Sequence, residues 1–288
     1  MTSDTDRNLF VKGIAFTQKN YRDLYPAIIP TRPEHSRAGK VVGITGASRG
    51  LGQLGFAASF APANAKAVAL LGRSTDGLAE TEKIVNEINP EAQVCSITVD
   101  ITDGAGVTKA FDEIVARFGV PHVLVNNAGA LASLASTVET DVESWWRTQE
   151  VNIKGTFLVT KAFLSRTGAT PSAPTTIINL TSGAAMGLVP GMGSYAITKL
   201  AVTKFTAYLQ AEHPTITSVR LVPGILATDM GMRYLWVSNG DKAFLSGKYL
   251  SVNRDVVELE ERKKEIVDGS LLTIFYLGKF GGPNVTVG

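Results

Sequence analysis

Six short apolar runs, rich in β-branched residues, recur along the chain from residue 41 onward. They alternate with longer stretches in which apolar residues return every three or four positions. Short runs of this kind between helical stretches are typical of a parallel sheet. The predicted strands are Val41 to Thr45, Ala67 to Leu71, Val94 to Val99, His122 to Asn126, Thr176 to Leu180 and Ser218 to Val222.

The stretches between these strands have the period of amphipathic helices. They predict helices over Leu78 to Ile88, Val107 to Phe118, Val142 to Leu164 and Tyr195 to Glu212. Right-handed crossovers would wind strands and helices into a doubly wound sheet. No internal repeat, low-complexity tract or linker divides the chain. The predicted fold class is therefore α/β, a Rossmann-type doubly wound parallel sheet in a single domain.

Residues 1–38 lack this alternation and contain Pro26, Pro30 and Pro33 without a sustained period. We interpret them as an N-terminal extension that packs along the surface of the main domain, residues 39–288.

Length and charge narrow the class of partner. Of the 288 residues, 44% are hydrophobic, which is ample for a substantial core. With 28 basic and 26 acidic side chains the net charge is only +2, which provides no broad basic field. We expect a small-molecule substrate, no nucleic-acid partner and no membrane partner.

Cysteine and histidine usage predicts no metal site. Cys95 is the single cysteine, so no internal disulfide can form, and a reducing, cytoplasmic compartment fits. His35, His122 and His213 do not pair at metal-ligand spacing. The first ten residues, MTSDTDRNLF, lack a signal-peptide apolar stretch, and no segment reaches the ~18 apolar residues of a membrane span.

A glycine-rich turn follows the first predicted strand and opens a helix, with Gly46, Ser48, Arg49, Gly50, Leu51 and Gly52 as its candidate binding residues. Glycine allows close approach of a pyrophosphate to the main chain, and helix N-terminal N–H groups face the anion. This context favours a dinucleotide phosphate site. A tight turn without a ligand is the alternative.

The end of the second strand indicates which dinucleotide binds. Folds that bind NAD place an acid there for the ribose 2′-hydroxyl, but this chain has Arg73 followed by Ser74. Arg73 and Arg49 offer cationic donors to a 2′-phosphate, which favours NADP(H) over NAD(H). Solvated surface charges are the alternative for either arginine.

Tyr195 and Lys199 lie four residues apart and so share one face of a helix. An ammonium close to the phenol should lower the Tyr195 pKa from about 10 by roughly 1–3 units. Tyr195 would then act as a general acid or base at a carbonyl or alcohol. Ser182 can hydrogen-bond the same oxygen and stabilise its charge as it develops.

These motifs together resemble those of the short-chain dehydrogenases/reductases over about residues 39–228. The family pairs TGxxxGxG with NNAG, a helix asparagine, a serine thirteen residues before the tyrosine, and YxxxK. The resemblance implies that Asn152 holds a proton-relaying water and that Lys199 also binds the nicotinamide ribose. It also implies cofactor contacts at Asp100, Ile101, Asn127, Ala128, Gly129, Tyr195, Pro223, Gly224, Ile225 and Thr228.

The implied activity is that of an NADPH-dependent oxidoreductase, which moves a hydride between nicotinamide and a carbonyl or alcohol carbon. The flanks Tyr25 to Glu34 and Leu271 to Ile274 resemble fungal members of natural-product pathways, which implies a ketone of a secondary metabolite as substrate. A non-redox isomerase, cyclase or dehydratase that keeps NADP(H) is the alternative. A cofactor-binding regulator without turnover would more naturally have lost one of the four catalytic residues.

The family also implies a homodimer or homotetramer, built on the helices that contain Asn152 and Tyr195. Trp145 and Trp146 lie on the first of these helices. Core packing is the default role for both, and a subunit interface is the alternative.

The chain departs from the family pattern after Thr228. There the family has a loop that covers the substrate, but Asp229 to Met232 run almost directly into Arg233 to Trp236, which resemble the next helix. Two explanations are possible: a true deletion, which leaves the pocket uncovered, or a mobile lid whose residues are absent from this chain. We favour the mobile lid because such lids are common in enzymes.

Overall fold

The strands form one parallel sheet at the centre of the molecule. The computed structural model describes residues 16–21, 25–132, 134–168, 174–223, 236–238, 242–269 and 271–273. In this part of the chain the strand order is β3-β2-β1-β4-β5-β6-β7. The strands are β1 (Val41–Thr45), β2 (Ala67–Gly72), β3 (Gln93–Thr98), β4 (Val123–Asn126), β5 (Thr176–Leu180), β6 (Thr217–Val222) and β7 (Tyr249–Ser251).

This sheet confirms the predicted doubly wound, single-domain fold. All six predicted strands are present, with boundaries shifted by one residue at most. Every residue of β1, β2, β4 and β5 is buried, as expected for strands covered on both faces. The edge strand β7 was not predicted, because three residues are too few to show a period.

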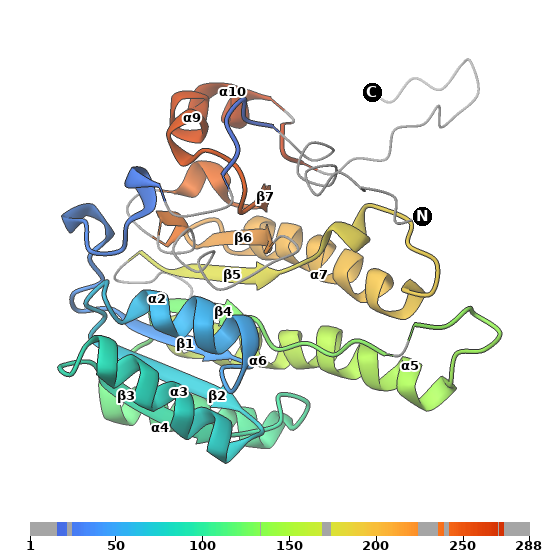
Figure 1. The fold of residues 1–288 in the computed structure, drawn as a ribbon, viewed down its shortest axis with the longest axis horizontal. Helices are drawn as coiled ribbons and strands as arrows, with labels where there is room; N and C mark the ends of the chain where they lie inside the picture. The colour runs from blue at the N-terminus through green and yellow to red at the C-terminus, as the bar shows by residue number, and fades with distance from the viewer. Residues whose placement is uncertain are drawn as a thin grey trace, which may run out of the picture.

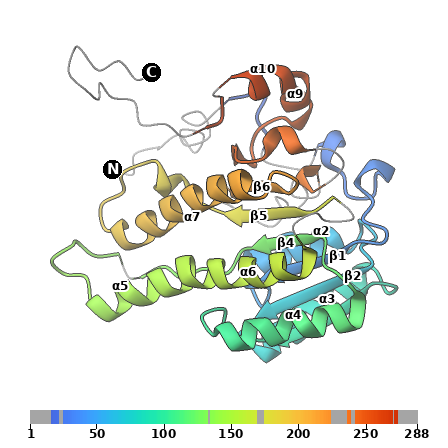
Figure 2. The same cartoon turned by 180° about the vertical axis from the view of Figure 1, so that it is seen from behind.

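Helices cover both faces of the sheet. On one face lie the π-helical segment η3 (Leu51–Ala57) with α2 (Ala58–Phe60), α3 (Thr75–Ile88), α9 (Val256–Glu261) and α10 (Lys263–Asp268) (Figure 1). On the other face lie α4 (Gly104–Phe118), α6 (Thr156–Thr167) and α7 (Gly193–Glu212) (Figure 2). Each layer buries its own apolar cluster, in which large rings fill the space between helix and strand. Phe56 and Phe60 belong to the first cluster, and Phe111 and Phe163 to the second.

Two helices begin three residues before their predicted starts, because polar caps precede the apolar period. Ser74 accepts a hydrogen bond from the Gly77 N–H at the start of α3, and Asp103 accepts one from Ala105 at the start of α4. Such side chains satisfy N–H groups that have no partner within the helix.

The single helix predicted over residues 142–164 is interrupted. It consists of α5 (Val142–Gln149), the π-helical segment η4 (Glu150–Gly155) and α6. Apolar periodicity did not show this break, which includes Asn152. Single π turns within helices are frequent at functional sites.

Part of the N-terminal extension packs on the segment that follows β7. Short 3₁₀ turns, η1 (Pro26–Ile28) and η2 (Pro33–His35), lead into the sheet; two others are η5 (Gly183–Ala185) and η7 (Ala243–Leu245). The Tyr25 hydroxyl accepts a hydrogen bond from the Val256 N–H at 2.8 Å. The Arg262 guanidinium lies 3.7 Å from the centre of the Phe16 ring. The two ends of the described chain thus meet beside β7.

The topology places a crevice at the carboxyl ends of β1 and β4. From β1 the chain first builds outward through β2 and β3, and then crosses to β4 on the other side. Ligands of doubly wound sheets bind where the strand order reverses in this way. Within the described residues, no helix is long and apolar enough to cross a membrane.

Candidate active site

The glycine turn after β1 is held tightly against the end of β4. A Cβ atom at Gly52 would lie 2.2 Å from the Gly46 carbonyl oxygen, and one at Gly46 would lie 2.7 Å from the Ala128 Cα. The Asn127 side-chain amide donates to the carbonyl oxygens of Thr45 (2.9 Å) and Gly46 (3.1 Å). Glycine at positions 46 and 52 is therefore required by close packing within the protein.

Gly50 meets a different requirement. Its φ of 57° is a conformation that other residues rarely adopt, and no atom lies within 4 Å of the position a Cβ would take. The open side of the turn is therefore where the main chain at the start of η3 can approach an anion. Leu51, the first residue of η3, lines the cavity described below. This geometry fits the pyrophosphate of a dinucleotide.

Arg73, at the end of β2, is exposed beside the glycine turn. A Cβ at Gly72 would lie 3.3 Å from the Ser48 hydroxyl, so the residues preceding Arg73 and Arg49 adjoin. Both arginines are exposed, and neither has an acidic partner among the described residues. The neighbouring Ser74, also predicted to contact the cofactor, accepts a hydrogen bond from the Gly77 N–H with its hydroxyl and so caps α3. The surface at this strand end is cationic and suits a phosphate.

Asp100, which follows β3, is held by a residue that the sequence did not indicate. Its Oδ1 accepts hydrogen bonds from the Thr102 N–H (2.9 Å) and hydroxyl (2.8 Å), and its Oδ2 accepts one from Arg147 at 2.7 Å. Burial raises the pKa of Asp100, but the hydrogen bonds from Thr102 and Arg147 outweigh it and lower the pKa below its ordinary value. Arg147 lies 47 residues away on α5, and no local signal links the two. The neighbouring Ile101 is buried.

Lys199 and Asn152 meet beside Gly129. A Cβ at Gly129 would lie 3.4 Å from Asn152 Oδ1 and 3.7 Å from Lys199 Nζ. Asn152 accepts from the Ala130 N–H (2.7 Å) and donates to the Ala130 carbonyl (2.8 Å) and the Thr198 hydroxyl (2.9 Å). These bonds tie η4 to the loop after β4 and to α7. The Asn152 side chain is thus fixed by backbone on one side and helix on the other.

Tyr195 and Lys199 face the same cavity from α7. Lys199 Nζ donates to the Leu180 carbonyl at 2.8 Å and lies 5.5 Å from the centre of the Tyr195 ring. Burial lowers the pKa of Lys199 to about 8. Burial also raises the pKa of Tyr195, although a hydrogen bond with Ser182 lowers it in part. The expectation that Lys199 lowers the Tyr195 pKa below 10 is therefore wrong for the protein alone, because removal of water from the phenol outweighs other effects.

Seven of the predicted site residues line one cavity of about 410 Å³: Leu51, Asn127, Gly129, Ser182, Tyr195, Lys199 and Pro223. It opens at the carboxyl ends of β1, β4, β5 and β6. The predicted residues Gly224, Ile225 and Thr228 lie outside the described residues, and so do residues 229–235, where the sequence departs from the family pattern. The lining consists of Leu51, Asn127, Gly129, Ala130, Leu131, Leu180, Thr181, Ser182, Met192, Tyr195, Lys199 and Pro223.

Comparison with known proteins identifies the family. A family model described as short chain dehydrogenase matches residues 40–235, which is more than half of the chain. The chain belongs to the short-chain dehydrogenase family. This dehydrogenase is 32% identical to "Short chain dehydrogenase mpl6" of Monascus purpureus, over 91% of this chain and 96% of the relative. It is 33% identical to "NADPH-dependent aldehyde reductase-like protein, chloroplastic" of Arabidopsis thaliana, over 69% of this chain and 77% of the relative.

A solved structure extends this similarity to the fold. The 3-oxoacyl-[acyl-carrier protein] reductase of Brucella melitensis with bound NAD is 25% identical to this dehydrogenase and superposes with a TM-score of 0.70, covering 81% of this chain and 95% of that one. The protein is thus an oxidoreductase of a family that uses NAD(H) or NADP(H).

Proposed function

We propose that this dehydrogenase reduces a ketone or aldehyde with NADPH, or oxidises the matching alcohol with NADP⁺. The observation that supports this most directly is the convergence of Ser182, Tyr195 and Lys199 on one cavity beside the glycine turn. Bound nicotinamide would supply or accept the hydride. The protein's own residues must then bind the carbonyl oxygen, move one proton and exclude water.

Tyr195 is the proton donor in this proposal. Burial keeps its pKa above the ordinary value, so the phenol is protonated at neutral pH and can donate to an oxygen that becomes an alkoxide. Ser182 lies within hydrogen-bonding reach of the Tyr195 hydroxyl and can hold the same oxygen. Lys199 would contact the nicotinamide ribose, and Asn152 would hold the water that returns a proton to Tyr195.

The preference for NADP(H) is supported by charge. Arg73 and Arg49 are exposed beside the glycine turn, and no acid occupies the end of β2. An acid there would repel a 2′-phosphate, whereas guanidinium groups form charge-assisted hydrogen bonds with it. We extend the proposal to a secondary-metabolite ketone as substrate, since a relative of nearly full coverage comes from Monascus, and to a cytoplasmic location, since Cys95 is a free, buried thiol.

The direct test is oxidation of NADPH, followed by its ultraviolet absorbance, with a panel of ketones, aldehydes and quinones, and identification of the product. We expect turnover with at least one carbonyl and a product two hydrogens heavier. Conversion of a substrate to an isomer or a dehydrated product, without oxidation of NADPH, would instead favour the non-redox alternative.

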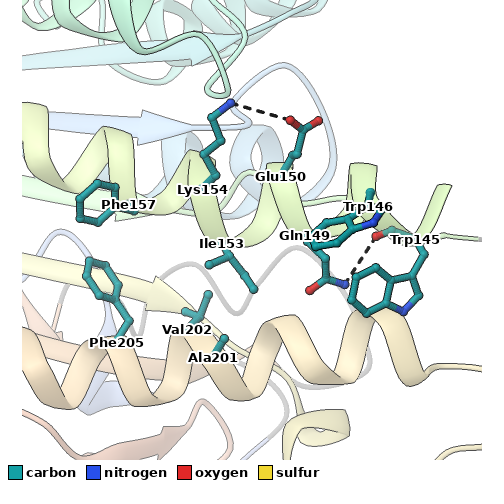
Figure 3. A pocket seen from close by; sticks show the side chains of 10 residues that line it. All are labelled: Trp145, Trp146, Gln149, Glu150, Ile153, Lys154, Phe157, Ala201, Val202 and Phe205. Carbon is teal, nitrogen blue, oxygen red and sulfur yellow. Dashed lines mark hydrogen bonds and ion pairs between the residues drawn. The ribbon is translucent and has the colours of Figure 1, made fainter. Parts of the chain in front are cut away.

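We also propose that two copies of the dehydrogenase associate through α5, α6 and α7. An apolar groove of about 580 Å³ runs between η4 and α7 (Figure 3). Trp146 and Phe157 are exposed at the edge of this groove. Large aromatic side chains are seldom left in water over a continuous surface, so we expect a partner to cover them. The charged residues Glu150 and Lys154, which line the groove, are of opposite sign and form an ion pair with one another at 3.8 Å. A second copy related by a two-fold axis can therefore pack against this groove without net electrostatic repulsion.

Sedimentation velocity tests this association. The wild-type protein should sediment as a dimer or tetramer, and Trp146→Asp should shift it toward the monomer. Ile88→Asp, which changes an exposed apolar residue at the end of α3, is the matched control and should leave the assembly unchanged. A single species of monomer mass at all working concentrations would contradict the proposal.

A further inference from the structure

Two loops beside the catalytic cavity expose a series of large apolar side chains. The first loop, between β4 and α5, exposes Leu131 (55%) and Leu134 (66%). The second, between η5 and α7, exposes Met186 and Val189 in part and Leu188 completely. Surface loops are normally polar, and a contiguous exposed apolar surface commonly marks a binding site. We call these five residues the apolar rim.

The two loops are joined and lie at the mouth of the cavity. The Ala135 N–H donates to the Gly191 carbonyl at 3.3 Å, and a Cβ at Gly191 would lie 3.6 Å from the Leu134 Cβ. Both loops project from the same end of the molecule, ahead of α5 and α7 (Figures 1 and 2). Leu131 of one loop and Met192 of the other line the catalytic cavity itself. The apolar rim therefore continues the wall of that cavity outward.

Neither loop offers a basic side chain to a ligand, and the two acids at the far end of the first loop accept hydrogen bonds there, Glu139 from the Ser136 hydroxyl and Asp141 from the Ser144 N–H. Residues 128–138 and 183–198 contain no Asp, Glu, Lys or Arg. Within the cavity the cation is Lys199, whose ammonium donates to the Leu180 carbonyl. An anionic group of a ligand lying across these loops would lose its hydration and gain no charged partner from them, which is costly.

There is room for a ligand larger than the cavity at Tyr195. A second cavity of about 770 Å³ lies under the same loops and is lined by Leu188, Val189 and Pro190 together with Trp145 and Ile197. Neither loop lines the groove between η4 and α7, so a second copy in that groove need not cover the rim.

We propose that the apolar rim binds the extended, uncharged apolar body of the substrate, while its carbonyl group enters the cavity at Ser182 and Tyr195. This inference rests on the proposed function and narrows its substrate class to neutral carbonyl compounds with a long aliphatic or aromatic body. Compounds with a phosphate or carboxylate far from the carbonyl are disfavoured.

A series of 2-alkanones from 2-butanone to 2-nonanone tests the proposal. Their dissociation constants are measured by titration calorimetry with the protein saturated with NADP⁺, so that binding is observed without turnover. Burial of a methylene group lowers the dissociation constant about fourfold. We therefore expect about this gain for each added methylene that reaches the rim. 8-Oxononanoate, which has a carboxylate at the far end of the same chain, should bind at least about tenfold more weakly than 2-nonanone.

The double variant Leu134→Ser/Leu188→Ser should reduce the gain per methylene and leave 2-butanone binding unchanged. Both side chains are exposed, so the circular-dichroism spectrum and Tm should match those of the wild type. The control is Ile88→Ser/Val267→Ser, which removes two exposed apolar residues from α3 and α10 and should keep the wild-type gain.

Other results would overturn the inference. These are binding that does not depend on chain length, a gain that persists in the Leu134→Ser/Leu188→Ser variant, or conversion of that variant to monomers, which would make the rim a subunit contact. The proposed function fails separately. If the alkanones bind with the expected gain but NADPH reduces none of them nor any other carbonyl, the redox activity is wrong and the rim is still a ligand site.

Discussion

The glycine turn and the apolar rim border the same cavity but are built in opposite ways. In the turn, an added Cβ at Gly52 would lie 2.2 Å from backbone, so packing alone specifies the residue. In the rim, the side chains of Leu134 and Leu188 are largely exposed to solvent. Residues that internal packing requires form short, recognisable motifs, whereas residues kept for a ligand have no internal constraint. The residues of the glycine turn can therefore be identified from the sequence, whereas the residues that we propose to bind the substrate are found only on the surface of the folded protein.

The largest effect is expected on the turnover rate, at Tyr195, which lines the cavity that the glycine turn and the apolar rim both border. Tyr195→Phe should lower kcat by about 10²–10⁴-fold, because general acid catalysis contributes this much, and leave NADPH binding nearly intact. Tyr208→Phe alters an exposed tyrosine of the same helix and serves as the control. Steady-state rates and NADPH dissociation constants give the result. Retention of most activity by Tyr195→Phe would exclude it as the proton donor.

The next largest effect is a difference in stability between variants at two glycines of the turn. Gly52→Ala should destabilise the fold by roughly 3 kcal/mol or more, since a Cβ there collides with backbone. Gly50→Ala meets no atom within 4 Å and should cost less, about 1–3 kcal/mol, through its backbone conformation of φ 57° and ψ −133°.

Urea unfolding of the two glycine variants, without cofactor, measures the difference. Gly50→Ala should instead weaken NADPH binding, since its Cβ would occupy the open side of the turn. Equal stability losses in both variants would show that the turn is not constrained as the structure indicates.

The cofactor preference should respond to Arg73 by a factor of roughly 10–100, the range expected for one or two charge-assisted hydrogen bonds. Arg73→Asp should weaken NADPH binding and narrow or reverse the preference over NADH. Lys83→Asp makes the same charge change on the exposed surface of α3 and should leave the preference unchanged. Dissociation constants of both cofactors decide the matter. Equal binding of NADPH and NADH by the wild type would refute the assignment.

The smallest effect is a pH dependence of stability that comes from Lys199. Burial lowers its pKa to about 8 in the folded protein, against 10.5 as the ordinary value. Between these two values the unfolded chain binds more protons than the folded protein, so this group's contribution to stability rises with pH.

Raising the pH from neutral toward 9 should therefore increase the Tm of the wild type relative to Lys199→Met, by about 2 °C. Lys204→Met, on the exposed side of the same helix, should show no such trend. A difference in Tm that stays constant with pH would mean that Lys199 is not buried as a cation.

The sequence by itself determined the strands, most of the crossover helices and the glycine turn, and it indicated four candidate catalytic residues. The strands and helices follow from apolar periodicity, and helix spacing sets Tyr195 and Lys199 on one face. Asn152 was indicated only by the resemblance to the family.

Only the tertiary structure decided the remaining features. The π turn at Asn152, the contact of Arg147 with Asp100 across 47 residues, and the joining of the two rim loops all arise from packing between distant segments. The raised pKa of Tyr195 has the same origin, because removal of water depends on every element that surrounds the phenol.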